Sequence, residues 1–141
     1  MKKITNGAIY HIDFGRTVSP EISDNHLGIL FKIPRVSNMV ICLPLTSPKE
    51  KHFKTLIGFE RRDSENLKYP SSYYIRRTDS IVLFDQLRTI SIFRVKGQYI
   101  NYKTNQFVYL RESDLKQLEM AFNNFFKTTL FINIDISKID R

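Results

Sequence analysis

The stretch that decides the fold reads Met39-Val-Ile-Cys-Leu-Pro-Leu-Thr-Ser-Pro-Lys49. Its first half, Met39–Leu43, is an unbroken apolar run. It is too short to cross a membrane and has the length of a strand buried on both faces. Pro44 has no N–H to donate to a sheet ladder, so regular pairing is expected to weaken there. The stretch then turns polar. It is either a plain turn or a rigid platform for chemistry, and its side chains are Thr46, Ser47 and Lys49.

The composition predicts one folded domain with a basic surface. The chain has 141 residues, of which 42% are hydrophobic, and it includes 11 phenylalanines and 7 tyrosines. A chain of this length and hydrophobicity can bury a core of useful size. Its net charge of +8 favours an anionic partner, with nucleic acid ahead of an acidic protein and a membrane surface.

Several classes of protein are disfavoured by what the sequence lacks. Cys42 is the only cysteine, so no disulfide can form within the chain, and no Cys/His cluster has the spacing of a zinc site. The first residues, Met1-Lys2-Lys3, are not followed by a hydrophobic signal core. No apolar run approaches the ~20 residues of a membrane span. We therefore expect a cytoplasmic protein without a metal, a cofactor or a membrane partner.

Apolar patterns predict several short strands around the central stretch. Apolar and polar residues alternate along Ala8–Phe14, which lies between two glycines. Leu27–Ile33 is a second apolar run, and the turn-type residues Pro34–Asn38 join it to Met39–Leu43 as a β-hairpin. Further strands are expected at Thr55–Phe59, Tyr73–Ile75, Ile81–Phe84 and Ser91–Val95, and in a hairpin of Gln98–Tyr102 with Gln106–Leu110.

One helix is predicted near the end of the chain, at Asp114–Lys127. Ser113 is a plausible N-cap, and Asp114 suits the first turn. Apolar residues at helical spacing then form one face, which consists of Leu115, Leu118, Phe122, Phe125 and Phe126. Beyond the helix, the alternating tail Ile132–Ser137 either adds an edge strand or binds a partner. Short strands followed by one helix predict a mainly β fold, as a compact antiparallel barrel or a strongly bent sheet.

A basic, aromatic segment follows the central stretch. Lys49–Arg77 holds eight Lys/Arg and four Asp/Glu, so it carries 8 − 4 = +4, half of the net charge of +8. Five aromatic residues are interleaved with these charges. Cations beside aromatic faces suit single-stranded nucleic acid, because phosphates meet the cations while bases stack on the rings. The alternative is a solvated loop whose aromatic residues cover the edge of the core.

Three segments resemble the MazF/PemK-type toxins in the same order along the chain. Gly7–Gly15 resembles their opening strand, Val40–Ser47 their strand ending in Pro-hydrophobic-Thr-Ser, and Asp85–Ile90 their Asp-Gln-hydrophobic-Arg-Thr-hydrophobic segment, which is the most specific. The resemblance covers about residues 5–95. It implies an SH3-like antiparallel β-barrel, a homodimer, and a metal-independent endoribonuclease of a toxin–antitoxin pair. It also implies one domain over residues 1–141, with a barrel at about 5–110, a helix at 114–127 and a tail at 128–141.

Two details modify this resemblance. After the glutamate that matches Glu21, the family has Arg-Pro, and its arginine is catalytic; this chain has His26-Leu27. In addition, Pro44–Lys49 is similar to the Pro-Leu-Thr-Ser-Pro-Lys of ToxN/AbiQ toxins, which share the barrel but are neutralised by an RNA antitoxin. That likeness implies active-site roles for the hydroxyls and the lysine of the motif. The antitoxin partner is therefore either a protein or an RNA.

The candidate residues fit RNA cleavage by the RNA's own 2′-OH. Such cleavage needs a base, an acid, and cations or hydrogen-bond donors that stabilise the charged phosphorane. His26 can serve as the acid or the base, because an unperturbed imidazole titrates at about 6.5. The catalytic candidates are His26, Thr46, Ser47, Lys49 and Arg88, and the supporting carboxylates are Glu21 and Asp85. The expected RNA contacts are Arg16, Lys51, His52, Lys54, Arg61, Arg62, Tyr73, Arg76 and Arg77. His11 is expected to be structural or to contact RNA.

Two other functions are compatible with the sequence. The same barrel serves CcdB-like toxins, which inhibit a protein target without catalysis, and fold does not fix function. A plain RNA-binding barrel without chemistry is the third hypothesis. The basic segment and the Thr-Ser-Pro-Lys motif favour the nuclease over both.

Overall fold

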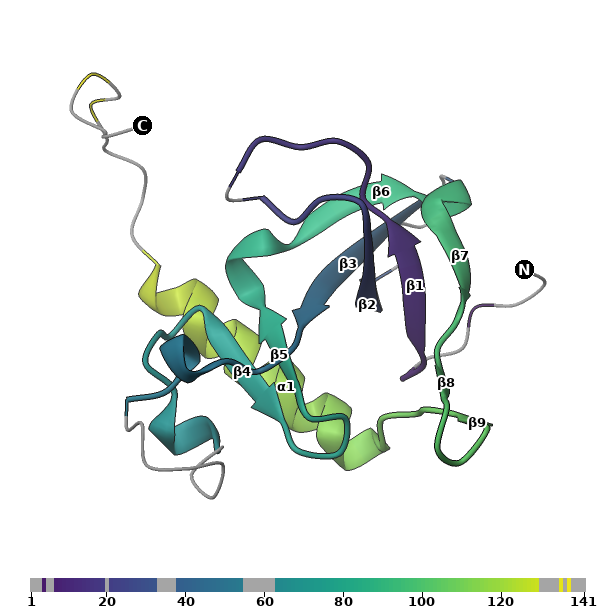
Figure 1. Cartoon of the computed structure of the whole chain (residues 1–141). Helices are drawn as coiled ribbons and strands as arrows, with labels where there is room; N and C mark the ends of the chain where they lie inside the picture. Colours follow the sequence, from purple (N-terminus) through teal and green to yellow (C-terminus); the bar gives the residue numbers. More distant parts are fainter. Residues whose placement is uncertain are drawn as a thin grey trace.

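A curled antiparallel sheet forms the body of the molecule (Figure 1). The computed structural model describes residues 4, 7–19, 21–32, 38–54, 63–129, 135 and 137. Seven strands make the sheet in the order β4-β5-β3-β2-β1-β7, and β6 also pairs with β3. The strands are β1 (Ile9–Asp13), β2 (Asn25–Lys32), β3 (Met39–Thr46), β4 (Ser72–Ile75), β5 (Ser80–Leu83), β6 (Arg88–Ser91) and β7 (Val95–Gln98).

The mainly β class is confirmed, but the barrel is not closed. The path of paired strands starts at β4 and ends at β7, and within the described residues these two strands do not pair with each other. The structure is therefore the strongly bent sheet, the alternative that the sequence left open. The predicted hairpin of the two apolar runs is also confirmed, because β2 and β3 pair antiparallel with Ile29 opposite Leu43.

Strand β3 lies at the centre of the sheet and changes one of its neighbours near Pro44. Its first half pairs with β6, up to Cys42 opposite Arg88. Its last residues pair with β5, starting with Leu45 opposite Val82. Pairing with β2 continues through Pro44 itself, which faces Gly28. Pro44 therefore does not end the strand. The change of partner from β6 to β5 takes place around this proline, which has no N–H to donate to a neighbouring strand.

Hydrophobic side chains fill both faces of the sheet. One cluster joins β1, β2, β3 and β6, and includes Tyr10, Ile12 and Val40, each at most 1% exposed. The cluster on the opposite face includes Ile9, Leu43 and Leu118, which are also at most 1% exposed. At β2 the packing leaves no room for a side chain at position 28, because a Cβ on Gly28 would lie 2.6 Å from Ile12 Cδ1. Removal of this much apolar surface from water is the main term that stabilises the sheet.

Helix α1 (Glu112–Thr128) covers the second face, beside β4 and β5 (Figure 1). Leu118 is buried, whereas Leu115, Phe122 and Phe125 are half-buried against the cluster. The expected apolar face is correct except for Phe126, which is 69% exposed. The helix also starts earlier than predicted. Ser113 lies inside the first turn, Arg111 is the N-cap, and its N–H donates to Asp114 Oδ2 at 2.9 Å.

Short elements connect the strands. They are the 3-10 turns η1 (Glu50–His52), η3 (Ser64–Asn66), η4 (Phe84–Gln86) and η5 (Ile92–Arg94), and a small hairpin of β8 (Ile100–Asn101) with β9 (Gln106–Phe107). The predicted strand at Thr55–Phe59 and the alternating tail lie outside the described residues, apart from Asp135 and Ser137. In the described part of the chain, no helix is long and apolar enough to cross a membrane.

Candidate functional site

A pocket of about 410 Å³ opens where β2 begins and β3 ends. Four of the five predicted catalytic residues line it, namely His26, Thr46, Ser47 and Lys49. Leu27 and Leu45 contribute apolar lining, and Asn25, Ser80 and His11 complete the wall. His26 therefore shares the pocket with three residues that lie 20 or more positions later in the chain, Thr46, Ser47 and Lys49. These four side chains are polar or titratable groups of the kind that phosphate chemistry uses.

The strand register explains why His26 and Thr46 meet. Gly28 faces Pro44 across the β2–β3 ladder. His26 lies two residues before Gly28 in β2 and Thr46 two residues after Pro44 in β3, so the antiparallel direction of the two strands brings both residues to the same end of the pair, where both line the pocket. Successive side chains of a strand point to opposite faces. His11 and its cross-strand partner Leu27 consequently belong to the other face. The pocket collects residues of both faces because it lies at the strand ends.

The turn that carries Lys49 is held by a buried histidine. His52 is 7% exposed, and its Nδ1 accepts a hydrogen bond from the Lys49 N–H at 2.9 Å. The His52 N–H in turn donates to the Lys49 carbonyl at 2.9 Å. Burial lowers the pKa of His52, and the charges of Lys51 and Lys49 lower it further. A neutral ring is what this hydrogen bond requires, because a protonated Nδ1 cannot accept. His52 therefore fixes the loop beneath Lys49 and presents little surface of its own.

Arg88, the fifth catalytic candidate, does not line this pocket. Its Nη2 donates to the Ile22 carbonyl at 2.8 Å, and Gln86 Oε1 accepts from the Ile22 N–H at 3.2 Å. The guanidinium also lies over the Phe14 ring, 4.7 Å from its centroid. Gln86 and Arg88 thus hold both backbone groups of one residue in the β1–β2 loop, more than 60 positions earlier in the chain. We call this pair of side chains the Ile22 clamp.

The Ile22 clamp acts on the loop that leads into the pocket. This loop is closed at its base, where Phe14 N–H donates to the Asp24 carbonyl and Asp24 N–H to the Gly15 carbonyl, each at 2.8 Å. The next residue, Asn25, already lines the pocket. The Asp-Gln-x-Arg segment that resembles a toxin motif therefore orders the approach to the site. The supporting candidates Glu21 and Asp85 are exposed, and neither lines the pocket.

His52 is buried, so it does not offer the surface that the predicted RNA contact needs, and the other predicted RNA-contact residues fall into three groups. Arg16, Lys51 and Lys54 are exposed. Tyr73, Arg76 and Arg77 line a separate pocket beside the β4–β5 turn. Arg61 and Arg62 lie outside the described residues.

Sequence reasoning missed three residues of the site. Asn25 and Ser80 carry no motif, and only strand register brings them to the wall of the pocket. His11 was expected to serve structure or RNA contact. Its edge meets the Tyr99 ring, with centroids 5.8 Å apart, and it lines the pocket. Alternation along β1 separates His11 from Tyr10 and Ile12, but it does not reveal that His11 lines the same pocket as Ser47.

Among the residues that the structure describes, no group of three His, Cys, Asp or Glu side chains could hold a metal ion. Burial raises the pKa of the Cys42 thiol to about 11, although the charge of Arg88 acts in the opposite direction. The thiol is therefore protonated at neutral pH and is a weak nucleophile.

A comparison with protein families finds one match over most of the chain. Residues 5–126 match the family described as PemK-like, MazF-like toxin of type II toxin–antitoxin system. No curated protein matches the chain. The matched region includes β1 to β9, nearly all of α1 and every residue that lines the pocket at the ends of β2 and β3.

The Ile22 clamp predicts a stability loss at Arg88. Arg88→Ala removes a charged donor and leaves the Ile22 carbonyl without it, which should lower the free energy of unfolding by about 1.5–3 kcal/mol. Chemical denaturation measures this loss. The matched control is Arg76→Ala, since the Arg76 side chain is exposed and forms no hydrogen bond or ion pair with the described residues, so its change should stay within about 0.5 kcal/mol. Equal stabilities of the two variants would contradict the clamp.

The buried His52 predicts a pH dependence of stability. Its pKa is lowered from 6.5 on folding, so the unfolded chain binds the proton more tightly. The His52 contribution to stability is therefore complete above pH 6.5 and declines as the pH falls below that value. His52→Asn supplies an amide oxygen that can accept from Lys49 N–H and does not titrate. Melting temperatures measured across this range should fall less steeply for His52→Asn, and parallel curves for the variant and the wild type would refute the role.

Proposed function

Because the chain belongs to the PemK-like, MazF-like toxin family of type II toxin–antitoxin systems, we propose that it is an endoribonuclease. In this proposal it cleaves single-stranded RNA by attack of a 2′-OH on the adjacent phosphorus, without a metal ion. The observation that carries the proposal is the pocket at the ends of β2 and β3, where His26, Thr46, Ser47 and Lys49 come together. The net charge of +8 is consistent with a polyanionic substrate.

Each of the four predicted catalytic residues in the pocket has a task in this reaction. His26 takes the proton from the 2′-OH or gives one to the leaving 5′-oxygen, because an imidazole can do either near neutral pH, and a solvent water molecule carries the other of these two protons. Thr46 and Ser47 donate hydrogen bonds to the non-bridging phosphate oxygens. Lys49 places its ammonium beside the phosphorane, where negative charge develops. The 2′-oxygen–phosphorus bond forms as the phosphorus–5′-oxygen bond breaks, which leaves a 2′,3′-cyclic phosphate and a 5′-hydroxyl.

The histidine changes how this site works relative to the family pattern. The family's arginine at this position cannot titrate in the working range, whereas an imidazole side chain can take up or release a proton there. His26 and Thr46 line the same pocket from two neighbouring strands, β2 and β3. A proton carrier and a hydrogen-bond donor then flank the same phosphate. Glu21 and Asp85 are assigned no role in the reaction in this proposal. Arg88 acts indirectly, by holding the β1–β2 loop through Ile22.

The family indicates the class of partner, and the identity of the partner is a further proposal. A type II system pairs the toxin with a protein antitoxin. Neutralisation by an RNA, which the Pro44–Lys49 segment suggested through ToxN/AbiQ toxins, is the alternative. We further propose that the protein acts as a homodimer in the cytoplasm, as the family resemblance implies.

A cleavage assay in EDTA tests the proposed function. The purified protein should cleave labelled single-stranded RNA, and Lys49→Ala should slow cleavage by about 10²–10³ because it removes a charge that stabilises the transition state. Lys127→Ala is the matched control, since Lys127 is exposed at the far end of α1. RNA binding without cleavage would favour the RNA-binding barrel, and neither activity would favour the CcdB-like inhibitor. Either result would overturn the nuclease.

Two variants of His26 test its role as a proton carrier. Cleavage by the wild type should vary with pH between about 5 and 8. His26→Ala should lose activity and that dependence while RNA binding persists. His26→Arg restores the family's cation but removes the titrating group, so it should be nearly as inactive as the alanine variant. If His26→Arg is active across the whole range, the site needs only a cation, and the assignment of proton transfer fails.

A further inference from the structure

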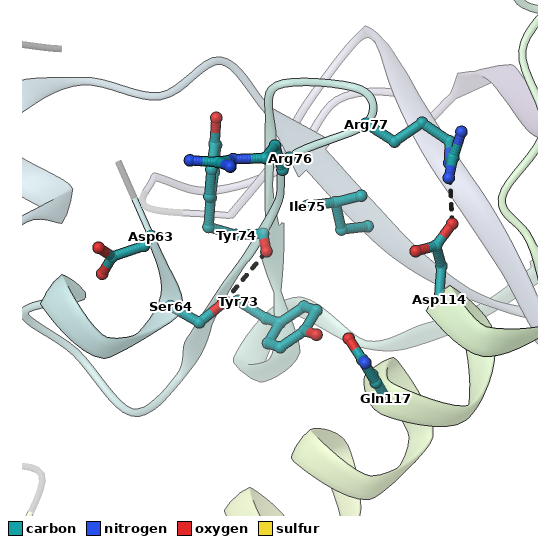
Figure 2. Close-up of a pocket in the computed structure, with 9 residues that line it drawn as sticks. All are labelled: Asp63, Ser64, Tyr73, Tyr74, Ile75, Arg76, Arg77, Asp114 and Gln117. Carbon is teal, nitrogen blue, oxygen red and sulfur yellow. Dashed lines mark hydrogen bonds and ion pairs between the residues drawn. The ribbon is translucent and has the colours of Figure 1, made fainter. Parts of the chain in front are cut away.

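We propose that the pocket beside the β4–β5 turn is a subsite that binds the base of a nucleotide next to the cleaved bond. The proposal rests on the proposed function, because it extends the same RNA strand from the catalytic pocket. This second pocket measures about 470 Å³, a usual size for a ligand site. Figure 2 shows its residues, which come from η3 and its N-cap, from β4 and the following turn, and from α1.

An ion pair fixes one side of the base pocket. Arg77 Nε lies 2.9 Å from Asp114 Oδ2, and the same oxygen accepts the Arg111 N–H at 2.9 Å. Burial alone would raise the pKa of Asp114, but these hydrogen bonds and the two arginine charges hold it below its usual value. The carboxylate is therefore ionised and its position is set. This interaction links the β4–β5 turn to the helix, so the wall is formed before any ligand arrives.

The charges of the base pocket suit a neutral, polar group better than a phosphate. Two arginines, Arg76 and Arg77, are balanced by two aspartates, Asp63 and Asp114. Gln117 adds an amide that offers both a donor and an acceptor. A free phosphate would meet the aspartates at a cost, whereas the edge of a base presents donors and acceptors of its own. The lining therefore points to a nucleobase.

Tyr73 gives the base pocket a flat aromatic wall. Its ring stacks on Phe84, with centroids 6.0 Å apart and planes inclined by 21°. Phe84 is 3% exposed and also contacts Phe122 and Phe125, so the stack is anchored in the core. In Figure 2 the hydroxyl end of Tyr73 points toward Gln117. Stacking on such a ring is the usual way in which proteins hold an unpaired base, and Gln117 lies where it can contact the edge of that base.

The sheet places the base pocket next to the catalytic pocket. Ile75 of β4 lines the base pocket and Ser80 of β5 lines the catalytic pocket, and these two residues face each other in the ladder. Neighbouring strands lie about 4.8 Å apart. An RNA strand that crosses the end of this hairpin can therefore reach both pockets. Arg76, which is exposed in the intervening turn, can meet the phosphate between them.

The experiment compares cleavage-site preferences of three variants on an RNA pool of randomised sequence, read by sequencing the new ends. Gln117→Ala should reduce discrimination among bases at one position beside the cut by about three- to tenfold, as expected for one lost hydrogen bond. Arg76→Ala should weaken cleavage of all sequences alike, because phosphate contacts carry no sequence information. Asn123→Ala, an exposed amide elsewhere on α1, should behave as wild type. Unaltered preferences in Gln117→Ala would overturn the base pocket.

A binding measurement separates failure of this proposal from failure of the nuclease. The probe is a pool of fully 2′-O-methylated RNA heptamers, which have no 2′-OH to attack and therefore stay intact. If the wild type cleaves nothing but Gln117→Ala changes which heptamers it retains, relative to Asn123→Ala, the base pocket stands and the catalytic proposal falls. If the wild type cleaves nothing and the three proteins retain the same heptamers, both proposals fall.

Discussion

The exchange of partners along β3 is the constraint on which both pockets depend. Up to Cys42 this strand pairs with β6, and from Leu45 it pairs with β5, while β2 stays on its other edge through Pro44. At this exchange the end of β3 leaves β6 and pairs with β5 of the β4–β5 hairpin. Thr46 and Ser47 therefore stand between the first residues of β2 and those of β5. Without this exchange of partners, Ser80 would not line the same pocket as His26, and the base pocket would not lie next to the catalytic pocket.

Most of the fold could be predicted from the sequence because its strands are short, apolar and separated by turn residues. The central run, the β2–β3 hairpin and the single helix follow from periodicity, and they hold in the structure. The errors have local causes. A helix needs a cap that satisfies its first N–H groups, and here Asp114 reaches back to Arg111, so Ser113 is not required. Phe126 matches the helical spacing of the apolar residues. Its side chain is nevertheless exposed, whereas that of the preceding residue, Phe125, is half-buried.

The candidate site was harder to predict, because spacing along the chain does not reveal strand register. Four of the predicted catalytic residues share one pocket; the short motif and the likeness to known toxins point to Thr46, Ser47 and Lys49, and His26 stands where the family has an arginine. Arg88 was grouped with them by the same likeness, yet its guanidinium is engaged by Ile22 and Phe14. The sequence places His52 among the expected RNA contacts of a basic loop, whereas in the structure it is buried and accepts a hydrogen bond from the Lys49 N–H. In both cases a long-range or buried contact decides the role, and the sequence carries no sign of it.

The central claim is that this pocket cleaves RNA through the substrate's own 2′-OH. Mass spectrometry of the fragments that the wild-type protein makes in EDTA tests it most directly, because the ends of the products record which oxygen attacked. The account predicts a 2′,3′-cyclic phosphate on the upstream fragment and a 5′-hydroxyl on the downstream one. Fragments with a 3′-hydroxyl and a 5′-phosphate would contradict it, since they require attack by water on the phosphorus with cleavage of the phosphorus–3′-oxygen bond.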